Sequence, residues 1–304
     1  MAGPAFRAAP VRVRVPATSA NLGPGFDAFG LALGLYDDVV VRIADQGLSI
    51  DIAGEGADTL KRDENHLVVR ALHATFEALG GRPAGLEVVC ANRIPHGRGL
   101  GSSAAAICAG VVAARALTIG GAERLDDEGA LAVATALEGH PDNVAACLLG
   151  GFTTAWTDEL GPHAVTTAPH PDVAPVVFVP STPLSTEVAR GLLPAQVPHS
   201  EASVNAGRAA LLVTALTSRP DLLLPATEDR LHQDYRAPAM PQSAALVGKL
   251  RGQGHAAVIS GAGPTVLALV TAERVDEVIG AAGTEWAATR LDVDTTGAGV
   301  LPLG

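Results

Sequence analysis

The alternation of hydrophobic and polar residues predicts where the strands of this chain lie. Residues 11–15 (VRVRV) alternate strictly, as expected of a strand with one face in water. Residues 16–30 are rich in Gly and Pro and predict a loop that is too long for a plain hairpin. Shorter apolar runs predict further strands at 37–43, 48–53, 85–91, 152–157, 174–179, 256–260, 265–270 and 290–295.

Apolar residues spaced three to four positions apart predict the helices. The helix expected at 65–79 ends at two glycines, which commonly terminate helices. Others are expected at 102–117, 126–137, 186–192, 201–217, 240–252 and 273–282, with a further helical turn after residue 143. Because strands and helices are mixed in both halves, and strands lie near the ends, the pattern predicts the α+β fold class.

The length of 304 residues favours two domains of about 150 residues each. A stretch rich in Pro, His and Thr at 158–172 separates two regions of regular pattern, so we place the boundary there. The expected domains are residues 1–160 and residues 161–304.

Composition and charge narrow the function. The net charge is −11, and Lys61 and Lys249 are the only lysines, which argues against general nucleic-acid binding. Three scattered cysteines in apolar surroundings indicate reduced, buried thiols. The start lacks a signal peptide's apolar segment, and the longest apolar stretch, 104–114, is too short to cross a bilayer. We therefore expect a soluble, cytoplasmic protein with no nucleic-acid or membrane partner.

A glycine-rich loop before the helix at 102–117 carries the strongest local chemistry. Alternate glycines let the backbone approach a ligand, and a helix N-terminus offers free N–H groups to an anion. The loop is neither a Walker A motif nor GxGxxG, and a flexible loop with a serine N-cap is the structural alternative. The expected phosphate-binding residues are Pro95, His96, Gly97, Arg98, Gly99, Leu100, Gly101, Ser102, Ser103, Ala104 and Ala105.

This loop resembles the phosphate loop of the GHMP kinases, which include galactokinases and homoserine, mevalonate and phosphomevalonate kinases. The family pattern is Pro, three variable residues, then Gly-Leu-Gly-Ser-Ser-Ala, and it matches from Pro95. Residues 16–27 (PATSANLGPGFD) and 260–265 (SGAGPT) agree as well, in the same order. The resemblance implies ATP as a substrate and the two-domain GHMP kinase fold. That fold joins an N-terminal domain like the second domain of ribosomal protein S5 to a ferredoxin-like C-terminal domain.

Within the family, the resemblance is to the homoserine kinase branch. Residues 16–27, 138–145 (EGHPDNVA), 185–190 (STEVAR) and 231–236 (LHQDYR) carry it. It implies phosphorylation of the side-chain hydroxyl of L-homoserine, in threonine biosynthesis. It also implies that Asn65 lies near the adenine. Because relatives are often dimers, a homodimer is a possible assembly.

Homoserine is a zwitterion with a hydroxyl, and the sequence offers a partner for each group. Its carboxylate suits Arg190 and Arg236, since guanidinium binds carboxylates bidentately, and its ammonium suits Asp27. Each has a structural alternative, a solvated helix arginine or a turn aspartate. The residues expected to orient or surround the substrate are Asn21, His140, Asn143, Thr186 and Gly263.

For the metal, the resemblance implies one serine and one glutamate, which we assign as Ser103 and Glu138. Mg²⁺ keeps several waters, so two protein ligands suffice. Phosphoryl transfer has a loose transition state, which favours direct in-line transfer with Asn143 and the metal aligning the groups. Asp142 as a general base is the alternative, and the structural alternative is that Asp142 or Asn143 caps a helix.

Two other functions stay open at this level. The chain could phosphorylate a different small alcohol, which a panel of alcohols would reveal. It could also be a metabolite-binding regulatory protein that kept the fold and lost turnover. Against the second stands the joint presence of the loop, Ser103, a candidate glutamate and the substrate-binding side chains.

Overall fold

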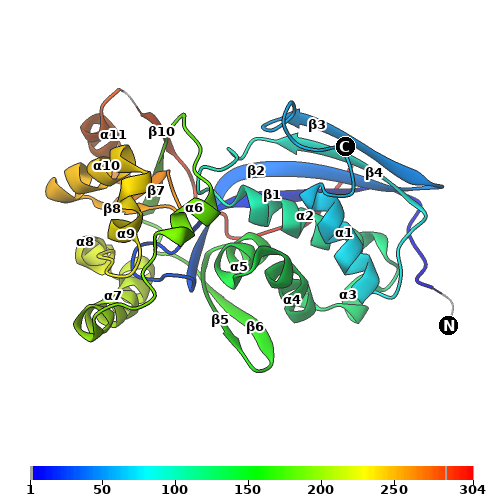
Figure 1. Ribbon diagram of the computed structural model, residues 1–304, viewed down its shortest axis with the longest axis horizontal. Helices are drawn as coiled ribbons and strands as arrows, with labels where there is room; N and C mark the ends of the chain where they lie inside the picture. Colours follow the sequence, from blue (N-terminus) through cyan, green and yellow to red (C-terminus); the bar gives the residue numbers. More distant parts are fainter. Residues whose placement is uncertain (1–2, 285, 304) are drawn as a thin grey trace.

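A computed structural model describes residues 3–284 and 286–303, and its elements form two sheets with helices packed on them (Figure 1). The larger sheet has seven strands, in the order β11-β1-β2-β4-β3, with β5 and β6 continuing from the start of β2. These strands are β1 (Val11–Ala20), β2 (Phe29–Ala44), β3 (Gly47–Gly54), β4 (Gly85–Asn92), β5 (Phe152–Asp158), β6 (Gly161–Thr167) and β11 (Gly299–Leu301).

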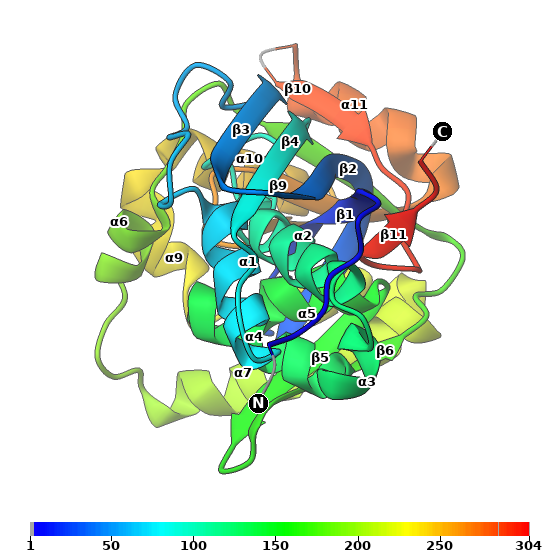
Figure 2. The same cartoon turned by 90° about the vertical axis from the view of Figure 1, so that its right-hand side faces the viewer.

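One group of helices lies along one face of the larger sheet (Figure 1). They are α1 (Leu67–Ala78), α2 (Ser102–Leu117), α3 (Gly121–Arg124), α4 (Asp127–Glu138) and α5 (Pro141–Leu149). Figure 2 shows α2 among α1, α4 and α5, and it contacts all three as well as β1. Most of its alanines are fully buried, and Gly110 lets α1 come close, since a Cβ there would lie 2.6 Å from the Cβ of Ala71.

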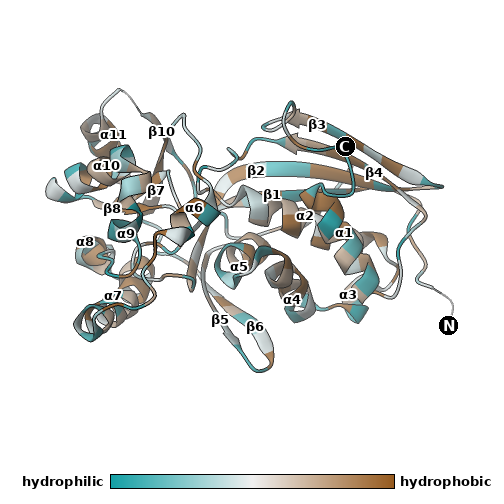
Figure 3. Ribbon diagram, viewed as in Figure 1, coloured by the Kyte–Doolittle hydropathy of each residue, from teal (hydrophilic) through white to brown (hydrophobic). Residues whose placement is uncertain are grey.

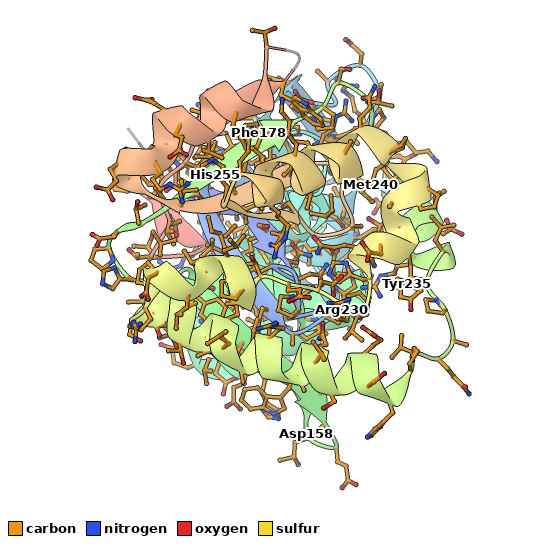
Figure 4. The ribbon with its side chains drawn as sticks, turned by 90° about the vertical axis from the view of Figure 1, so that its left-hand side faces the viewer. Asp158, Phe178, Arg230, Tyr235, Met240 and His255 are labelled. Carbon is orange, nitrogen blue, oxygen red and sulfur yellow. The ribbon has the colours of Figure 1, made fainter. Side chains whose placement is uncertain are left out.

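The smaller sheet is antiparallel, in the order β10-β7-β9-β8. Its strands are β7 (Val173–Val179), β8 (Ala256–Ile259), β9 (Val266–Thr271) and β10 (Ala287–Arg290). Helices α10 (Pro241–Gly252) and α11 (Val275–Ala282) cover its outer face, where Phe178 and Met240 belong to the core (Figure 4). The remaining helices are α6 (Thr186–Gly191), α7 (His199–Thr217), α8 (Leu223–Ala226) and α9 (Gln233–Arg236), with short 3₁₀ turns at Pro220–Leu222, Ala237–Ala239 and Ala272–Arg274.

The hydrophobic core continues from one sheet to the other. Hydrophobic residues run along β2 and α2 in Figure 3, and the buried cluster they belong to extends to Val258 and Leu267 on the inner face of the smaller sheet. A second cluster lies between that sheet and α10 and α11. In the part of the chain that is described, no helix has both the length and the apolar character needed to cross a membrane.

Several predicted elements differ from the structure. Residues 16–20, expected to be loop, continue β1, because they pair with β2 past an irregularity between Pro16 and Ala17. The strand expected at 290–295 was wrong: β10 ends at Arg290, and the following residues lie against the larger sheet. The short elements α3, β6, α8, α9 and β11 were not predicted, because three to seven residues carry little periodic pattern.

The expected domain boundary at residue 160 falls in the turn between β5 and β6, which pair along their whole length in the larger sheet. The last strand, β11, also joins the larger sheet, by pairing with β1. We propose a division after Thr167, which keeps the β5–β6 hairpin intact, with the chain returning to the first unit after β10.

Candidate active site

The glycine-rich loop connects β4 to α2, and its glycines are required by both backbone conformation and packing. Gly97, Gly99 and Gly101 have φ values of 63°, 77° and 70°. A Cβ on Gly99 would lie 2.3 Å from the carbonyl oxygen of Ser260, and one on Gly101 would lie 1.9 Å from Oγ1 of Thr18. Helix α2 then begins without a side-chain cap. Its first N–H groups are therefore available to an anion.

Three sequence segments that lie far apart in the chain meet at this loop. The amide of Thr18 donates to the carbonyl of Leu100 at 3.0 Å, which ties the N-terminal segment to the loop. The amide of Thr265 donates to the carbonyl of Arg98 at 3.1 Å, which ties the C-terminal segment to it. The amide of Gly261 donates to the carbonyl of Ala20 at 3.0 Å, which ties the C-terminal segment to the N-terminal segment. The resembling motifs thus form one structural unit.

Two cavities open on either side of the loop. One encloses about 400 Å³ between the loop and the start of α1. The other encloses about 210 Å³ and is lined by charged and polar side chains. Ser102 and Ser103 line both cavities, so the N-terminus of α2 lies where they adjoin. The first cavity holds Asn65, Lys61, His66, His96 and Asp37 among apolar walls, and the second holds Asn21, Glu138, His140, Asp142, Asn143, Thr186, Arg190 and Arg236.

Ser103 and Glu138, the expected metal ligands, are in direct contact. The Ser103 hydroxyl donates to Oε2 of Glu138 at 2.7 Å. Glu138 is the last residue of α4 and Ser103 is the second residue of α2, so the packing of these two helices brings the pair together. Burial raises the pKa of Glu138 above its ordinary value, although the hydrogen bond from Ser103 opposes the shift. Two oxygen donors facing one polar cavity form a donor set that suits a hard divalent cation.

The start of α5 brings three expected residues together. Nδ1 of His140 lies 2.5 Å from Oδ1 of Asp142, and the same oxygen accepts the backbone N–H of Asn143 at 2.8 Å. Oδ1 of Asn143 accepts the hydroxyl of Thr18 at 2.8 Å. Burial acts to lower the pKa of His140, but the hydrogen bond and the charge of Asp142 outweigh it, so the pKa is raised. The alternative of a helix cap at Asp142 or Asn143 was wrong, because the N-cap position of α5 is His140, without a side-chain cap, and both residues lie in the first turn of the helix.

Asp27 and Arg190, assigned to opposite ends of the substrate, pair with each other. The guanidinium nitrogens lie 2.6 and 3.2 Å from the two carboxylate oxygens. Asn21 supports this loop, because its Oδ1 accepts the Asp27 amide at 2.9 Å and its Nδ2 donates to the carbonyl of Gly261 at 2.9 Å. Asn21 and Asp27 both have positive φ, at 69° and 55°. This pairing was not predictable from the sequence, since α6 carries Arg190 to the loop only in the folded chain.

Arg236 is 1% exposed and has no carboxylate within ion-pair distance among the described residues. Its Nη1 lies 3.2 Å from Nδ1 of His232, and its buried Nε has no partner within the described chain. Burial lowers its pKa from the ordinary value. The ring of Phe26 lies under both guanidinium groups, 5.3 Å from Arg236 and 5.7 Å from Arg190. Sequence reasoning assigned no role to Phe26, His232 or Thr18, although all lie within or beside the matched segments.

Other expected residues lie at the edge of the site or outside the cavities. Nε of Arg98 donates to the carbonyl of Pro180 at 2.9 Å, so this side chain braces the loop from outside. Leu100 and Ala104 are buried in the core. Gly263 is packed against Met240, while its neighbours Gly261 and Ala262 line the charged cavity.

The ligand atoms of three further side chains lie close enough together to hold a metal ion. Ligand atoms of Asp27, His140 and Asp142 lie within 4.8 Å of one another. Arg190 already engages both carboxylate oxygens of Asp27, and His140 engages Asp142. The charges of these three side chains are therefore already paired within the protein.

Comparisons with known proteins identify the family. A model for the GHMP kinases N terminal domain matches residues 66–151, and one for the GHMP kinases C terminal matches residues 208–288. The homoserine kinase of Streptomyces coelicolor is 71% identical over 303 residues, which covers 100% of this chain and 98% of the relative. The chain therefore belongs to the GHMP kinase family.

Solved structures give the same assignment. A putative homoserine kinase from Listeria monocytogenes is 30% identical with a TM-score of 0.76, covering 97% of this chain and 100% of the other. The homoserine kinase of Cytophaga hutchinsonii has a TM-score of 0.84 at 26% identity, covering 99% and 100%. Within its family the chain groups with the homoserine kinases, and the predicted family, fold class and phosphotransferase activity are confirmed.

Proposed function

We propose that this chain transfers the γ-phosphoryl group of ATP to the side-chain hydroxyl of L-homoserine, by direct in-line transfer assisted by Mg²⁺. One observation carries the proposal: the phosphate loop and the start of α2 lie between a largely apolar cavity and a charged one, and Ser102 and Ser103 line both. A nucleotide base fits the first and a zwitterion fits the second. The transferred phosphoryl group then lies at the junction.

The nucleotide is bound mainly by backbone groups in this proposal. The loop of residues 95–101 and the uncapped first turn of α2 offer N–H donors to the phosphates. Asn65 lines the apolar cavity and lies beside the base. Lys61 lines the same cavity and adds a positive charge that sequence reasoning left outside any motif.

The substrate is held by its charges. Arg236 binds the carboxylate, because it is a buried guanidinium without an acidic partner in the described chain. Asp27 binds the ammonium. Arg190 is then released from its ion pair with Asp27 and interacts with the carboxylate. Asn143, fixed by Thr18, and His140, fixed by Asp142, orient the hydroxyl toward the junction.

Ser103 and Glu138 would hold Mg²⁺, since their oxygens are 2.7 Å apart at the junction of the cavities. The ion would neutralise charge on the phosphate oxygens during transfer. No strong base is required in this proposal, and the hydroxyl proton passes to the transferred phosphoryl group. Asp142 keeps His140 and the start of α5 in place.

The first experiment measures ADP release from ATP and Mg²⁺, with L-homoserine set against D-homoserine, L-threonine, mevalonate and galactose. Turnover with L-homoserine alone supports the assignment of the charged cavity. Turnover only with another alcohol would preserve the nucleotide assignment and refute the substrate assignment. ATP binding without turnover on any acceptor would refute the kinase proposal.

A further inference from the structure

His232 lies behind the charged cavity, between Arg236 and the backbone of Gly23. Its Nε2 is 2.9 Å from the carbonyl oxygen of Gly23, and its Nδ1 is 3.2 Å from Nη1 of Arg236. The side chain is fully buried, and its ring stacks on Phe26 with 5.2 Å between the ring centroids. Arg236 lines the charged cavity and His232 does not. His232 can therefore affect the site only through the groups that it contacts.

The carbonyl of Gly23 determines which ring nitrogen of His232 carries the proton. A carbonyl oxygen only accepts, so the close Nε2 must donate to it. Burial lowers the pKa of His232, although the charge of Asp229 opposes the shift, and the neutral ring is favoured. A neutral ring that is protonated at Nε2 has a lone pair at Nδ1. Because a guanidinium only donates, the second contact is a hydrogen bond from Arg236 to His232.

Arg236 is therefore held by neutral acceptors. Besides the imidazole, its Nη1 donates to the carbonyl of Gly261 at 3.4 Å. Arg190 differs, because it is held by the carboxylate of Asp27. Nε and Nη2 of Arg236 make no hydrogen bond within the described residues, and these two nitrogens form one edge of the guanidinium. Such an edge can bind a carboxylate through two parallel hydrogen bonds.

We propose that His232 is a positioning residue for substrate recognition: its Nδ1 holds Nη1 of Arg236 and leaves the edge formed by Nε and Nη2 to the substrate carboxylate. A carboxylate at position 232 would also hold the guanidinium, but it would compensate the positive charge before the substrate arrived. The neutral imidazole orients the cation and leaves its charge to the ligand. The inference rests on the proposed function, which assigns the carboxylate of homoserine to Arg236.

The test uses two amides that replace different halves of the imidazole. The side chain of His232→Asn places an amide oxygen near the position of Nδ1, whereas that of His232→Gln extends to the position of Nε2. Steady-state kinetics are measured with L-homoserine and with 3-amino-1-propanol, which is homoserine without its carboxylate. Where the second acceptor is not turned over, its inhibition constant replaces kcat/KM.

We expect His232→Gln to raise the KM for homoserine by about 10-fold, the value of one hydrogen bond to a charged group. His232→Asn should stay within about 3-fold of the native chain, because it keeps an acceptor for Arg236. With 3-amino-1-propanol both variants should match the native chain within about 2-fold, since no carboxylate is present. The KM for ATP should also change by less than about 2-fold.

His255→Gln is the matched control, since His255 is as deeply buried as His232 but lines neither cavity of the site. It should leave the constants for both acceptors within about 2-fold. Nitrogen NMR of the native chain tests the tautomer of His232 directly and does not require a variant to fold. We expect a proton on Nε2 and none on Nδ1.

Three results would overturn the role of His232. They are a proton on Nδ1, recovery by His232→Gln in place of His232→Asn, and an equal loss for homoserine and 3-amino-1-propanol. The second would show that the ring only supports Gly23, and the third that it only supports the fold. Failure of the proposed function looks different, because the native chain itself would then not phosphorylate homoserine or would not prefer it to 3-amino-1-propanol.

Discussion

At the scale of single residues, Arg236 is a buried cation in the wall of the charged cavity, with no carboxylate partner in the described chain. The side chain is almost fully buried, yet its contacts are an imidazole, a backbone carbonyl and an aromatic face. A buried guanidinium without a counter-charge is unfavourable until an anion arrives. In the proposed function, its energy of interaction with the homoserine carboxylate would therefore be realised only when the substrate binds.

Replacing Arg236 with Met should weaken homoserine binding far more than ATP binding. A charge-assisted hydrogen bond contributes about 1.5–3 kcal/mol, so the KM for homoserine should rise by about 10- to 150-fold. The KM for ATP should change by less than about 3-fold. Arg219→Met is the control, since Arg219 is exposed and pairs only with Asp221 in the described chain. Equal weakening of both substrates would instead indicate a structural role for Arg236.

Asp142→Asn separates the two mechanisms that the sequence left open. A general base commonly contributes about 10²–10⁴-fold to a rate. If Asp142 only positions its neighbours, kcat should fall by less than about 100-fold, because the amide oxygen can still accept the Asn143 amide. Steady-state rates across pH make the comparison. A larger loss, together with disappearance of an acidic limb in the pH profile, would identify Asp142 as the base.

At the scale of elements, the β1–β2 ladder depends on an ion cluster around Asp38. Arg14 donates to both oxygens of Asp38 at 3.0 Å, and Arg12 lies 3.3 Å away on the same strand. Burial acts to raise the pKa of Asp38, but the hydrogen bonds from the two arginines outweigh it and lower the pKa. A lowered carboxyl pKa stabilises the fold above the unfolded value, and the stabilisation is lost as pH falls through the folded value.

Asp38→Asn should therefore lower the free energy of unfolding by about 1 kcal/mol at neutral pH. The difference from the native chain should shrink toward zero in acid, when the native carboxyl is also uncharged. Urea unfolding at several pH values measures both quantities. Asp51→Asn is the control, because Asp51 is exposed on β3 and makes no ion pair within the described residues. A difference that persists unchanged in acid would contradict the electrostatic explanation.

Elements also differ in how far the sequence determines them. The bounds of α2 were predicted correctly, because sixteen residues of alanine-rich sequence follow a glycine-rich loop. Strand β11 was missed, since three residues extended along β1 are set by their partner and not by their own pattern. The motif residues indicated the family, and the structure shows that their segments meet at the phosphate loop. They could not predict the pairing of Asp27 with Arg190, which depends on where α6 docks.

At the scale of the whole molecule, the C-terminal segment binds the two units together. After β10 the chain returns to the larger sheet, where the amide of Gly34 donates to the carbonyl of Asp292 at 2.8 Å and the amide of Asp294 to the carbonyl of Ala32 at 3.1 Å. The hydroxyl of Tyr36 donates to Oδ2 of Asp294 at 2.9 Å. Burial and this hydrogen bond raise the pKa of Tyr36 to about 12.

Deleting residues 292–304 should destabilise the entire chain, because it removes β11 and exposes the edge of β1. A loss of several kcal/mol in a chain of this size lowers the melting temperature by about 10 °C. Scanning calorimetry should show the larger sheet and the smaller sheet unfolding together. A shorter deletion that ends the chain at Leu301 keeps β11 and should change the melting temperature little. An unchanged melting temperature for the longer deletion would disprove the role of the segment.

If homoserine binds as we propose, it exchanges partners with the ion pair between Asp27 and Arg190. Homoserine brings one positive and one negative group, and the pair that it would separate also consists of one of each. The net charge of the cavity and ligand together is unchanged, so few counterions are taken up or released. Affinity for homoserine should accordingly vary little with salt concentration. An analogue with only one of the two charges would leave half of the pair without a partner, and the cavity would exclude it.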